Sequence, residues 1–223
     1  NGETTEDVTD LAEGDYTVII SDGCGATNSF TFSIGVNGDC PTPLSAFVTT
    51  WEVTAGDLSI VIPTLAASGA YNYSVDWGDG TNSTNQTGDA THTYPSADVY
   101  TVVITGTFPH FYLNGNATIL GNHLKLKSIE QWGDQQWASM ELAFAGADNM
   151  VYNATDAPDL SNVTSSYRMF YQNRSIGNPD LTNWITTTIT SMESMFADSD
   201  FNGNISNWDV SNVTTMSHMF IHS

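Results

Sequence analysis

Two aspartates in a glycine-rich turn are the residues of this sequence whose types and spacing best suit a metal ion. Asp76 and Asp79 stand in the segment Asp-Trp-Gly-Asp-Gly at residues 76–80. Carboxylates in a turn can ligate Ca²⁺ through oxygen, but an aspartate in a tight turn also accepts hydrogen bonds from its own backbone. We favour turn capping at both positions and keep calcium as an optional ligand, with no cofactor required.

The sequence offers no second constellation of catalytic residue types. Its five histidines are scattered, and His218 and His222 alone share the i, i+4 spacing that could hold a metal on a helix. No third ligand accompanies them, so a surface position explains them better. No nucleophile has a base at a recognisable spacing, and the many carboxylates define no acid/base pair. The sequence therefore predicts a protein that is not an enzyme.

Residues 137–220 repeat one phrase, and this repeat must position whatever the chain binds. Its corners begin at Trp137, Val163, Ile189 and Val213, in steps of 26, 26 and 24 residues. A phenylalanine follows each corner, at Phe144, Phe170, Phe196 and Phe220. A fixed period in the twenties is typical of a solenoid, whose coils bury their apolar faces against one another.

Each repeat combines a short strand pattern with a helical one. Apolar residues at Ile205, Trp208, Val210 and Val213 predict a short strand ending at a corner. The Met-x-x-Met-Phe spacing after the corner predicts one or two turns of helix. Residues between the buried positions point outward and stack in rows, which are Asp159, Ile185 and Asp209, and Asn162, Thr188 and Asn212. We expect these rows to form the binding face, the alternative being a plain solvated surface.

Composition excludes two classes of function. The chain has 223 residues and a net charge of −21, from 25 acidic against 4 basic side chains, and residues 1–124 contain no Lys or Arg. Such a surface repels phosphate backbones, which excludes nucleic-acid binding. No run of about 18 apolar residues is present, so we expect no membrane insertion.

Strand patterns dominate the first half of the chain. Alternating residues at 15–20 and 30–34 predict a hairpin, and prolines at 41 and 43 suggest a boundary. Four further strands are predicted at Phe47–Val53, Leu58–Ile62, Tyr71–Trp77 and Tyr100–Phe108. We therefore predict a mostly β fold: a partial β domain at 1–40, a β-sandwich at 45–113, and a leucine-rich-repeat-type β/α solenoid at 124–223.

Two cysteines permit one disulfide. Cys24 falls in the expected hairpin turn, whereas Cys40 follows the return strand and lies near its far end. A bridge between them requires the linker to fold back, so both the bonded and the unbonded state stay open.

Three stretches resemble known families. Leu11–Val18 followed by Asp22-Gly23-Cys24 resembles the end of the SprB repeat of bacterial adhesins. Tyr73–Thr81, with His92-Thr93-Tyr94 and Tyr100-Thr101-Val102, resembles a PKD domain, although Val99 departs from the usual Gly-x before the tyrosine. Phe201–Phe220 and Ser128–Met140 resemble the BspA-like leucine-rich-repeat surface proteins of bacteria.

These resemblances imply a function at the bacterial cell surface. We expect an extracellular adhesin fragment in which β domains act as a spacer and the solenoid binds an extracellular protein or glycan. Further repeats of the same parent chain are expected at both ends. Two alternatives stay open: a carbohydrate-binding accessory module of a larger secreted enzyme, and a purely structural stalk.

Overall fold

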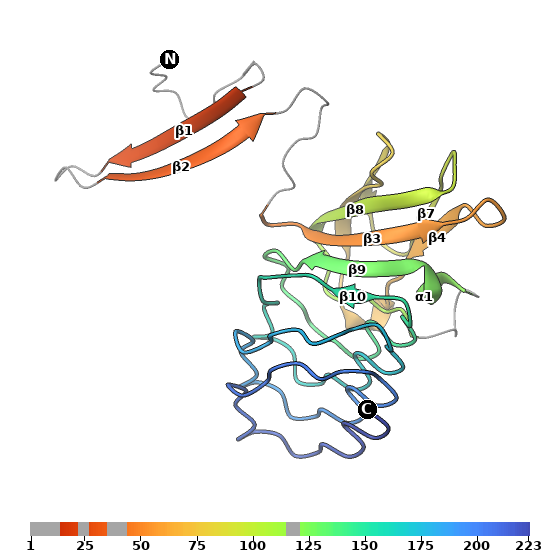
Figure 1. Cartoon of the computed structure of the whole chain (residues 1–223), viewed down its shortest axis with the longest axis vertical. Helices are drawn as coiled ribbons and strands as arrows, with labels where there is room; N and C mark the ends of the chain where they lie inside the picture. The colour runs from red at the N-terminus through yellow and green to blue at the C-terminus, as the bar shows by residue number, and fades with distance from the viewer. Residues whose placement is uncertain (1–13, 22–26, 35–43, 115–120) are drawn as a thin grey trace. The chain divides into compact units, whose positions relative to one another are not determined.

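A computed structural model describes residues 14–21, 27–34, 44–114 and 121–223. The chain divides into two compact units, Asn1–Pro43 and Leu44–Ser223. In the first unit, β1 (Gly14–Ser21) and β2 (Thr27–Ile34) pair antiparallel from Gly14–Ile34 to Ser21–Thr27 (Figure 1). This confirms the predicted hairpin, while Cys24 and Cys40 lie outside the described residues.

A six-stranded mixed sheet opens the second unit. Its order is β10-β9-β3-β8-β5-β6, in which β10 and β9 are parallel and every other pair is antiparallel. The strands are β3 (Phe47–Val53), β5 (Asn72–Asp76), β6 (Asn82–Gln86), β8 (Asp98–Thr107), β9 (Leu126–Gln131) and β10 (Val151–Tyr152). The sequence predicted β3, β5 and β8, but β6 carries no apolar residue and was missed.

A second, two-stranded sheet pairs β4 (Ser59–Ile62) with β7 (Ala90–Thr93). Ile60 and Ile62 of β4 are buried in the same core as Val75 of β5 and Val102 of β8. The described helices are one turn each, η1 (Ala66–Ser68) and α1 (Asn122–Lys125). The fold is therefore mostly β, as the strand patterns of the sequence predicted.

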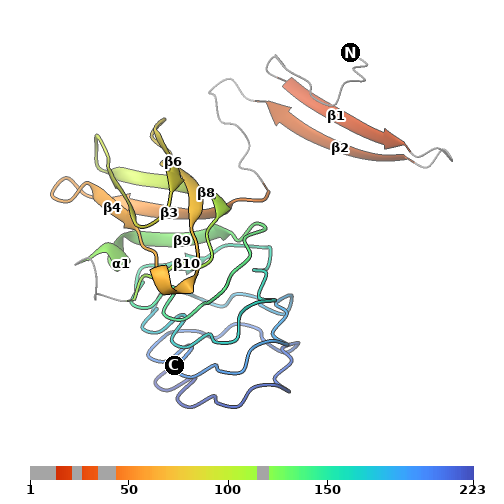
Figure 2. The same ribbon diagram turned by 180° about the vertical axis from the view of Figure 1, so that it is seen from behind.

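The large sheet continues directly into the repeat. Strand β9 belongs by sequence to the segment 124–223, yet it pairs along β3 (Figure 2). Phe47 of β3 packs against Trp132 and Trp137, with ring centroids 5.7 and 5.1 Å apart. Gly133 follows β9 with φ of 67°, and a Cβ there would lie 2.3 Å from the Ala46 carbonyl oxygen. Only glycine lets the two backbones approach this closely.

After β9 the chain forms coils that stack on one another, drawn from green through teal to blue in Figure 1. Backbone amides of one coil donate to carbonyls of the next: Arg168 to Glu193 at 3.1 Å, and Phe170 to Met195 at 2.9 Å. The same register continues one coil on, where Phe196 donates to Met219 at 2.9 Å. The repeat of the sequence is thus a repeat of hydrogen-bond partners.

Turns, not helices, build the segment that follows each corner. Alternate amides point in different directions, since Phe196 donates to the next coil while Met195 donates to Met192 of its own. Two residues four apart in each coil have positive φ: Leu142 and Gly146, Arg168 and Gln172, Ser194 and Asp198, His218 and His222. Every second amide that an α-helix would need is therefore used between coils.

The predicted leucine-rich-repeat-type β/α solenoid is wrong in this respect. No described residue after Lys125 is helical, and the coil strands shrink to isolated parallel bridges such as Asp180 with Asn204. The Met-x-x-Met-Phe spacing that predicted a helix serves the consecutive turns equally well. Both arrangements put residues three and four apart on the buried side.

A ladder of phenylalanine rings runs through the coils. Neighbouring rings stack nearly parallel, with centroids 5.5 Å apart for Phe144 and Phe170 and 5.6 Å apart for Phe170 and Phe196. Phe111, which precedes the repeat, extends the ladder by stacking on Phe144 at 5.2 Å. The methionines of the repeat belong to the same continuous core, except Met216 of the last coil, which is exposed.

Candidate functional site

Each carboxylate of the predicted metal pair caps its own turn. Oδ1 of Asp76 accepts a hydrogen bond from the amide of Gly78 at 2.9 Å. Oδ1 of Asp79 accepts from the amide and the hydroxyl of Thr81, at 3.0 and 2.6 Å. The turn needs glycine, because Gly78 has φ of 77° and a Cβ there would lie 2.3 Å from the Thr101 carbonyl oxygen.

Asp79 also holds a histidine against the aromatic core. Its Oδ2 lies 2.7 Å from Nε2 of His92, and the Asp79 side chain is only 5% exposed. The imidazole stacks on Trp77, with ring centroids 4.8 Å apart and planes 13° apart. Burial raises the pKa of the Asp79 carboxyl, but hydrogen bonds from Thr81 and His92 outweigh this and lower it below its usual range.

These contacts leave little capacity for a cation. Within residues 14–21, 27–34, 44–114 and 121–223, no three His, Cys, Asp or Glu side chains gather around a common point. His218 and His222 are not on a helix; their Nδ1 atoms lie 2.8 Å from Ser217 Oγ and 2.9 Å from Asp198 Oδ1. Calcium at Asp76 and Asp79 stays a prediction.

The predicted binding rows lie on the coil stack, where side-chain hydrogen bonds connect neighbouring coils. Thr188 Oγ1 donates to the Leu160 carbonyl at 2.8 Å, and Asn212 Nδ2 donates to the Thr187 carbonyl at 2.8 Å. The carbonyl of Asp209 accepts from Thr186 Oγ1 at 2.9 Å. Each bond joins neighbouring coils, so the rows follow the repeat register.

The remaining members of the rows are exposed or cap local turns. Asp159 and Asp209 each accept from the amide two residues on, at 2.9 Å, and hydrogen bonds from Ser161 and Ser211 lower the pKa of the two carboxyls. Asn162 is exposed, and Ile185 is 71% exposed. The rows thus present an apolar side chain between polar ones that are fixed in place.

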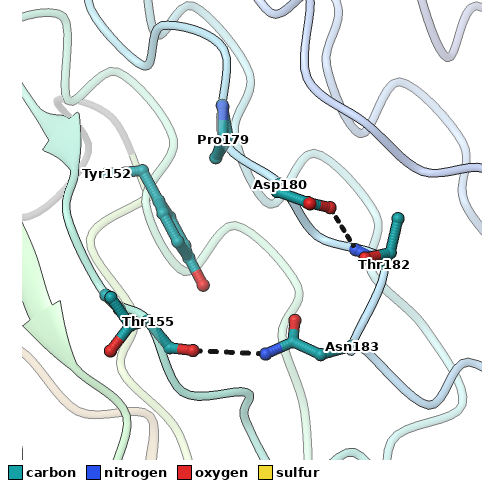
Figure 3. A pocket seen from close by; sticks show the side chains of 7 residues that line it. Tyr152, Thr155, Pro179, Asp180, Thr182 and Asn183 are labelled. Carbon is teal, nitrogen blue, oxygen red and sulfur yellow. Dashed lines mark hydrogen bonds between the residues drawn. The ribbon is translucent and has the colours of Figure 1, made fainter.

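A shallow hollow of about 410 Å³ lies on the same stack (Figure 3). Its lining comes from two neighbouring coils: Tyr152, Ala154, Thr155, Pro179, Asp180, Thr182 and Asn183. A hydrogen bond of 3.3 Å from Asn183 Nδ2 to the Thr155 carbonyl ties the two coils together across it. Asp180 caps the amide of Thr182 at 3.1 Å, and hydrogen bonds from Thr182 lower the pKa of its carboxyl.

Tyr152 is anchored by two tryptophans. Its hydroxyl accepts from the indole nitrogens of Trp132 and Trp184, at 2.7 and 3.3 Å. Burial raises the pKa of Tyr152 to about 12, although both indole donors favour the phenolate. The phenol therefore stays neutral and acts as a fixed hydrogen-bonding group, not as a base.

Sequence reasoning missed this hollow. Tyr152 stands outside the repeated phrase, and the hollow depends on how two coils are offset. No signal in the sequence marks it, since Asn183 and Trp184 recur as Asn207 and Trp208 in the next coil.

Residues 119–223 match the model of a family described as Mycoplasma protein of unknown function, DUF285. No curated protein and no solved structure matches the chain. The match covers the coil stack with its lead-in, and its description gives no activity.

This finding corrects the family resemblances. The repeat matches DUF285 and not the BspA-like leucine-rich-repeat proteins, and nothing supports the PKD or SprB resemblance. The motif at residues 76–80 has a local explanation, since turn capping by Asp76 and Asp79 and packing of Trp77 require those residue types.

The part of the chain that the structure describes contains no helix with the length and apolarity needed for a membrane span.

Proposed function

We propose that this chain is a binding fragment of an extracellular adhesin, located at a bacterial cell surface. The coil stack presents the binding face, and the β-rich region 45–113, arranged as a sandwich, acts as its spacer. The ligand is an extracellular protein or glycan.

One observation carries this proposal: polar side chains of the face are fixed by hydrogen bonds between coils. Thr188 and Asn212 each bond to the coil before their own, at 2.8 Å. Such a face keeps its shape before a ligand arrives, which lowers the entropic cost of binding. The exposed side chain of Ile185 adds an apolar contact at its centre.

The high negative charge supports a role outside nucleic-acid chemistry. A net charge of −21 keeps the chain soluble and discourages polyanionic ligands. Ligands that are neutral or basic on their contact surface suit it best.

A glycan array combined with a cell-binding assay on the whole chain tests the proposal. Ile185→Ser and Asn212→Ala should weaken binding roughly tenfold, as loss of one central contact of one to two kcal/mol does. Thr87→Ala, an exposed change in the β-rich region, should leave binding unchanged. Equal binding by all variants would show that this face of the coil stack does not bind the ligand.

The hollow favours a second candidate, a carbohydrate-binding accessory module of a larger secreted enzyme. A fixed phenol, a carboxylate and an amide around about 410 Å³ provide the kind of polar set that orients a sugar ring. Glycan binding that Asn183→Ala abolishes, without attachment to cells, would favour this candidate. Binding to neither glycans nor cells would leave a purely structural stalk.

A further inference from the structure

His110 lies buried at the junction between the β-rich region and the first coil. Its side chain is only 1% exposed. The chain on either side of it bonds to the first coil, because the Ala138 amide donates to the Pro109 carbonyl at 2.8 Å and the Leu113 amide donates to the Ala143 carbonyl at 3.2 Å. His110 therefore stands among the hydrogen bonds that close the first end of the coil stack.

The imidazole joins two regions through its two ring nitrogens. Nδ1 lies 2.7 Å from Oγ of Ser68 in η1, and Nε2 lies 2.8 Å from the carbonyl oxygen of Glu141 in the first coil. A carbonyl oxygen only accepts, so Nε2 carries the hydrogen, and Nδ1 of the neutral ring accepts from the Ser68 hydroxyl. The neutral ring thus satisfies a donor of the β-rich region and an acceptor of the first coil at once.

Few groups that face the ring could balance a positive charge. Of the described residues, Glu141 supplies the one charged group that acts on His110, and its side chain is exposed. The other titratable neighbours are phenols: the Tyr71 hydroxyl donates to the His110 carbonyl at 2.9 Å, and the Tyr112 ring centroid lies 5.3 Å from that of the imidazole. Burial lowers the pKa of His110, and the backbone bond to Glu141 and its carboxylate only partly offset this.

Protonation changes the contacts of the ring. A protonated imidazole is a donor at both nitrogens, so Ser68 must reverse its hydroxyl and direct its own hydrogen to another acceptor. The charge also lies in a site that solvent barely reaches, which costs free energy. In an opened junction the ring is hydrated and takes up a proton at its ordinary pKa of about 6.5. As the pH falls below this value, the opened junction is therefore favoured over the closed one.

We propose that His110 is a pH-sensitive switch that holds the first coil to the β-rich region at neutral pH and releases it in mild acid. The released state loses the hydrogen bonds of the junction, while the coils beyond keep those that join them to one another. This switch goes beyond the proposed function, since it concerns how the coil stack is held and not what it binds.

Hydrogen exchange of the whole chain at about pH 7.5 and about pH 5, corrected for the intrinsic exchange rate at each pH, tests the proposal. The protection factors of Leu113, Asn114 and Ala138 should fall roughly tenfold, as proton uptake by one histidine in the opened junction predicts. Those of Arg168 and Phe170, whose amides donate from coil to coil, should stay the same.

Variants separate the switch from other effects of pH. His110→Gln keeps a donor and an acceptor but cannot titrate, so it should abolish the pH-dependent loss of protection. His218→Gln removes an exposed histidine at the other end of the stack and should retain the loss in full. Ser68→Ala removes the hydrogen bond that favours the neutral ring, so it should move the loss to higher pH.

The other outcomes overturn the proposal. Equal protection at both pH values would show that the closed junction tolerates the charge. An equal loss at Arg168 and Phe170 would show that acid acts on the whole stack, and a loss that His110→Gln retains would belong to another group. If His110→Gln does not fold, the imidazole proton shifts of the wild-type chain decide, because a His110 ring that titrates at about pH 6.5 or above would contradict the switch.

Discussion

The two ends of the coil stack differ in how they are closed. At the first end, Phe111 stacks on Phe144, and the amides of Leu113 and Asn114 donate to carbonyls of Ala143 and Leu142 at 3.2 and 3.1 Å. At the last coil, Phe220 stacks on Phe196 at 5.7 Å and is 45% exposed. The same ring position is therefore core at one end and surface at the other.

Backbone groups show the same contrast. The amides of Arg168 and Phe170 donate to the next coil, whereas those of His218, Phe220 and His222 have no acceptor among residues 44–114 and 121–223. A repeat of this kind stabilises each coil mainly through its neighbours. The residue type at a repeat position is thus a poor guide to how much that residue stabilises the fold. Its contribution depends on whether neighbouring coils pack against it on both sides.

Removing one phenylalanine ring at each end of the coil stack should give the largest difference in stability between the two ends. Phe144→Ala empties a fully buried site between two stacked rings and should lower the free energy of unfolding by about 3–5 kcal/mol. Phe220→Ala at the open end should cost about 1 kcal/mol. Urea unfolding of both variants measures the difference, and equal losses would contradict the contrast between the ends.

Substitutions at two glycines distinguish the cost of backbone strain from the cost of a steric clash where the large sheet meets the first coil. Gly133 and Gly177 both have positive φ, but an added Cβ meets the Ala46 carbonyl at 2.3 Å in the first case and nothing within 4 Å in the second. Gly177→Ala should cost about 1 kcal/mol from strain alone. Gly133→Ala should cost at least about 2 kcal/mol more, because the sheet and the first coil must separate. Thermal unfolding compares the two variants. Similar melting temperatures would show that the large sheet and the first coil are not closely packed at Gly133.

Lowering the pH should destabilise the β-rich region more than the coils. The pKa of Asp79 is lowered in the folded chain, so its contribution to stability is present above the unfolded value of about 3.9 and is lost as the pH falls through the folded value. We expect this contribution to be lost as the pH falls below about 4. Asp79→Asn should flatten this fall, whereas Asp209→Asn, at an exposed cap, should change it less. The opposite ranking in pH-dependent unfolding would refute this assignment.

Calcium should have the smallest effect. Both carboxylates of the turn already accept hydrogen bonds from Gly78 and Thr81, so a cation would have to compete with them. The melting temperature in excess calcium should lie within about 1 °C of that in chelator. Calcium that bound the folded state and not the unfolded state would raise it. A clear rise that Asp76→Asn removes would restore a calcium site at this turn.

The sequence predicted those parts of the fold that alternate or repeat visibly. Strands β3, β5 and β8 carry β-branched and aromatic residues on a period of two, and the coil period follows from the recurring phenylalanines. Strands β6 and β7 are short and largely polar, and they form because their partners are present. No local pattern marks such strands.

The candidate sites were predictable only in part. Capping by Asp76 and Asp79 follows from local turn chemistry, which a sequence displays directly. The hollow around Tyr152 depends on contacts between coils about 26 residues apart. The helix predicted from Met192, Met195 and Phe196 failed for the same reason, since amides bonded to the next coil.

Hydrogen exchange tests the central contrast most directly. In a monomeric sample, the amides of Arg168, Phe170 and Gln172, which donate to the next coil, should exchange slowly. Those of His218, Phe220 and His222 should exchange fastest in the coil stack, because no residue that the structure describes accepts their hydrogen bonds. Protection at residues 213–220 equal to that at 163–170 would show that a coil needs no neighbour on its far side, and would contradict the account.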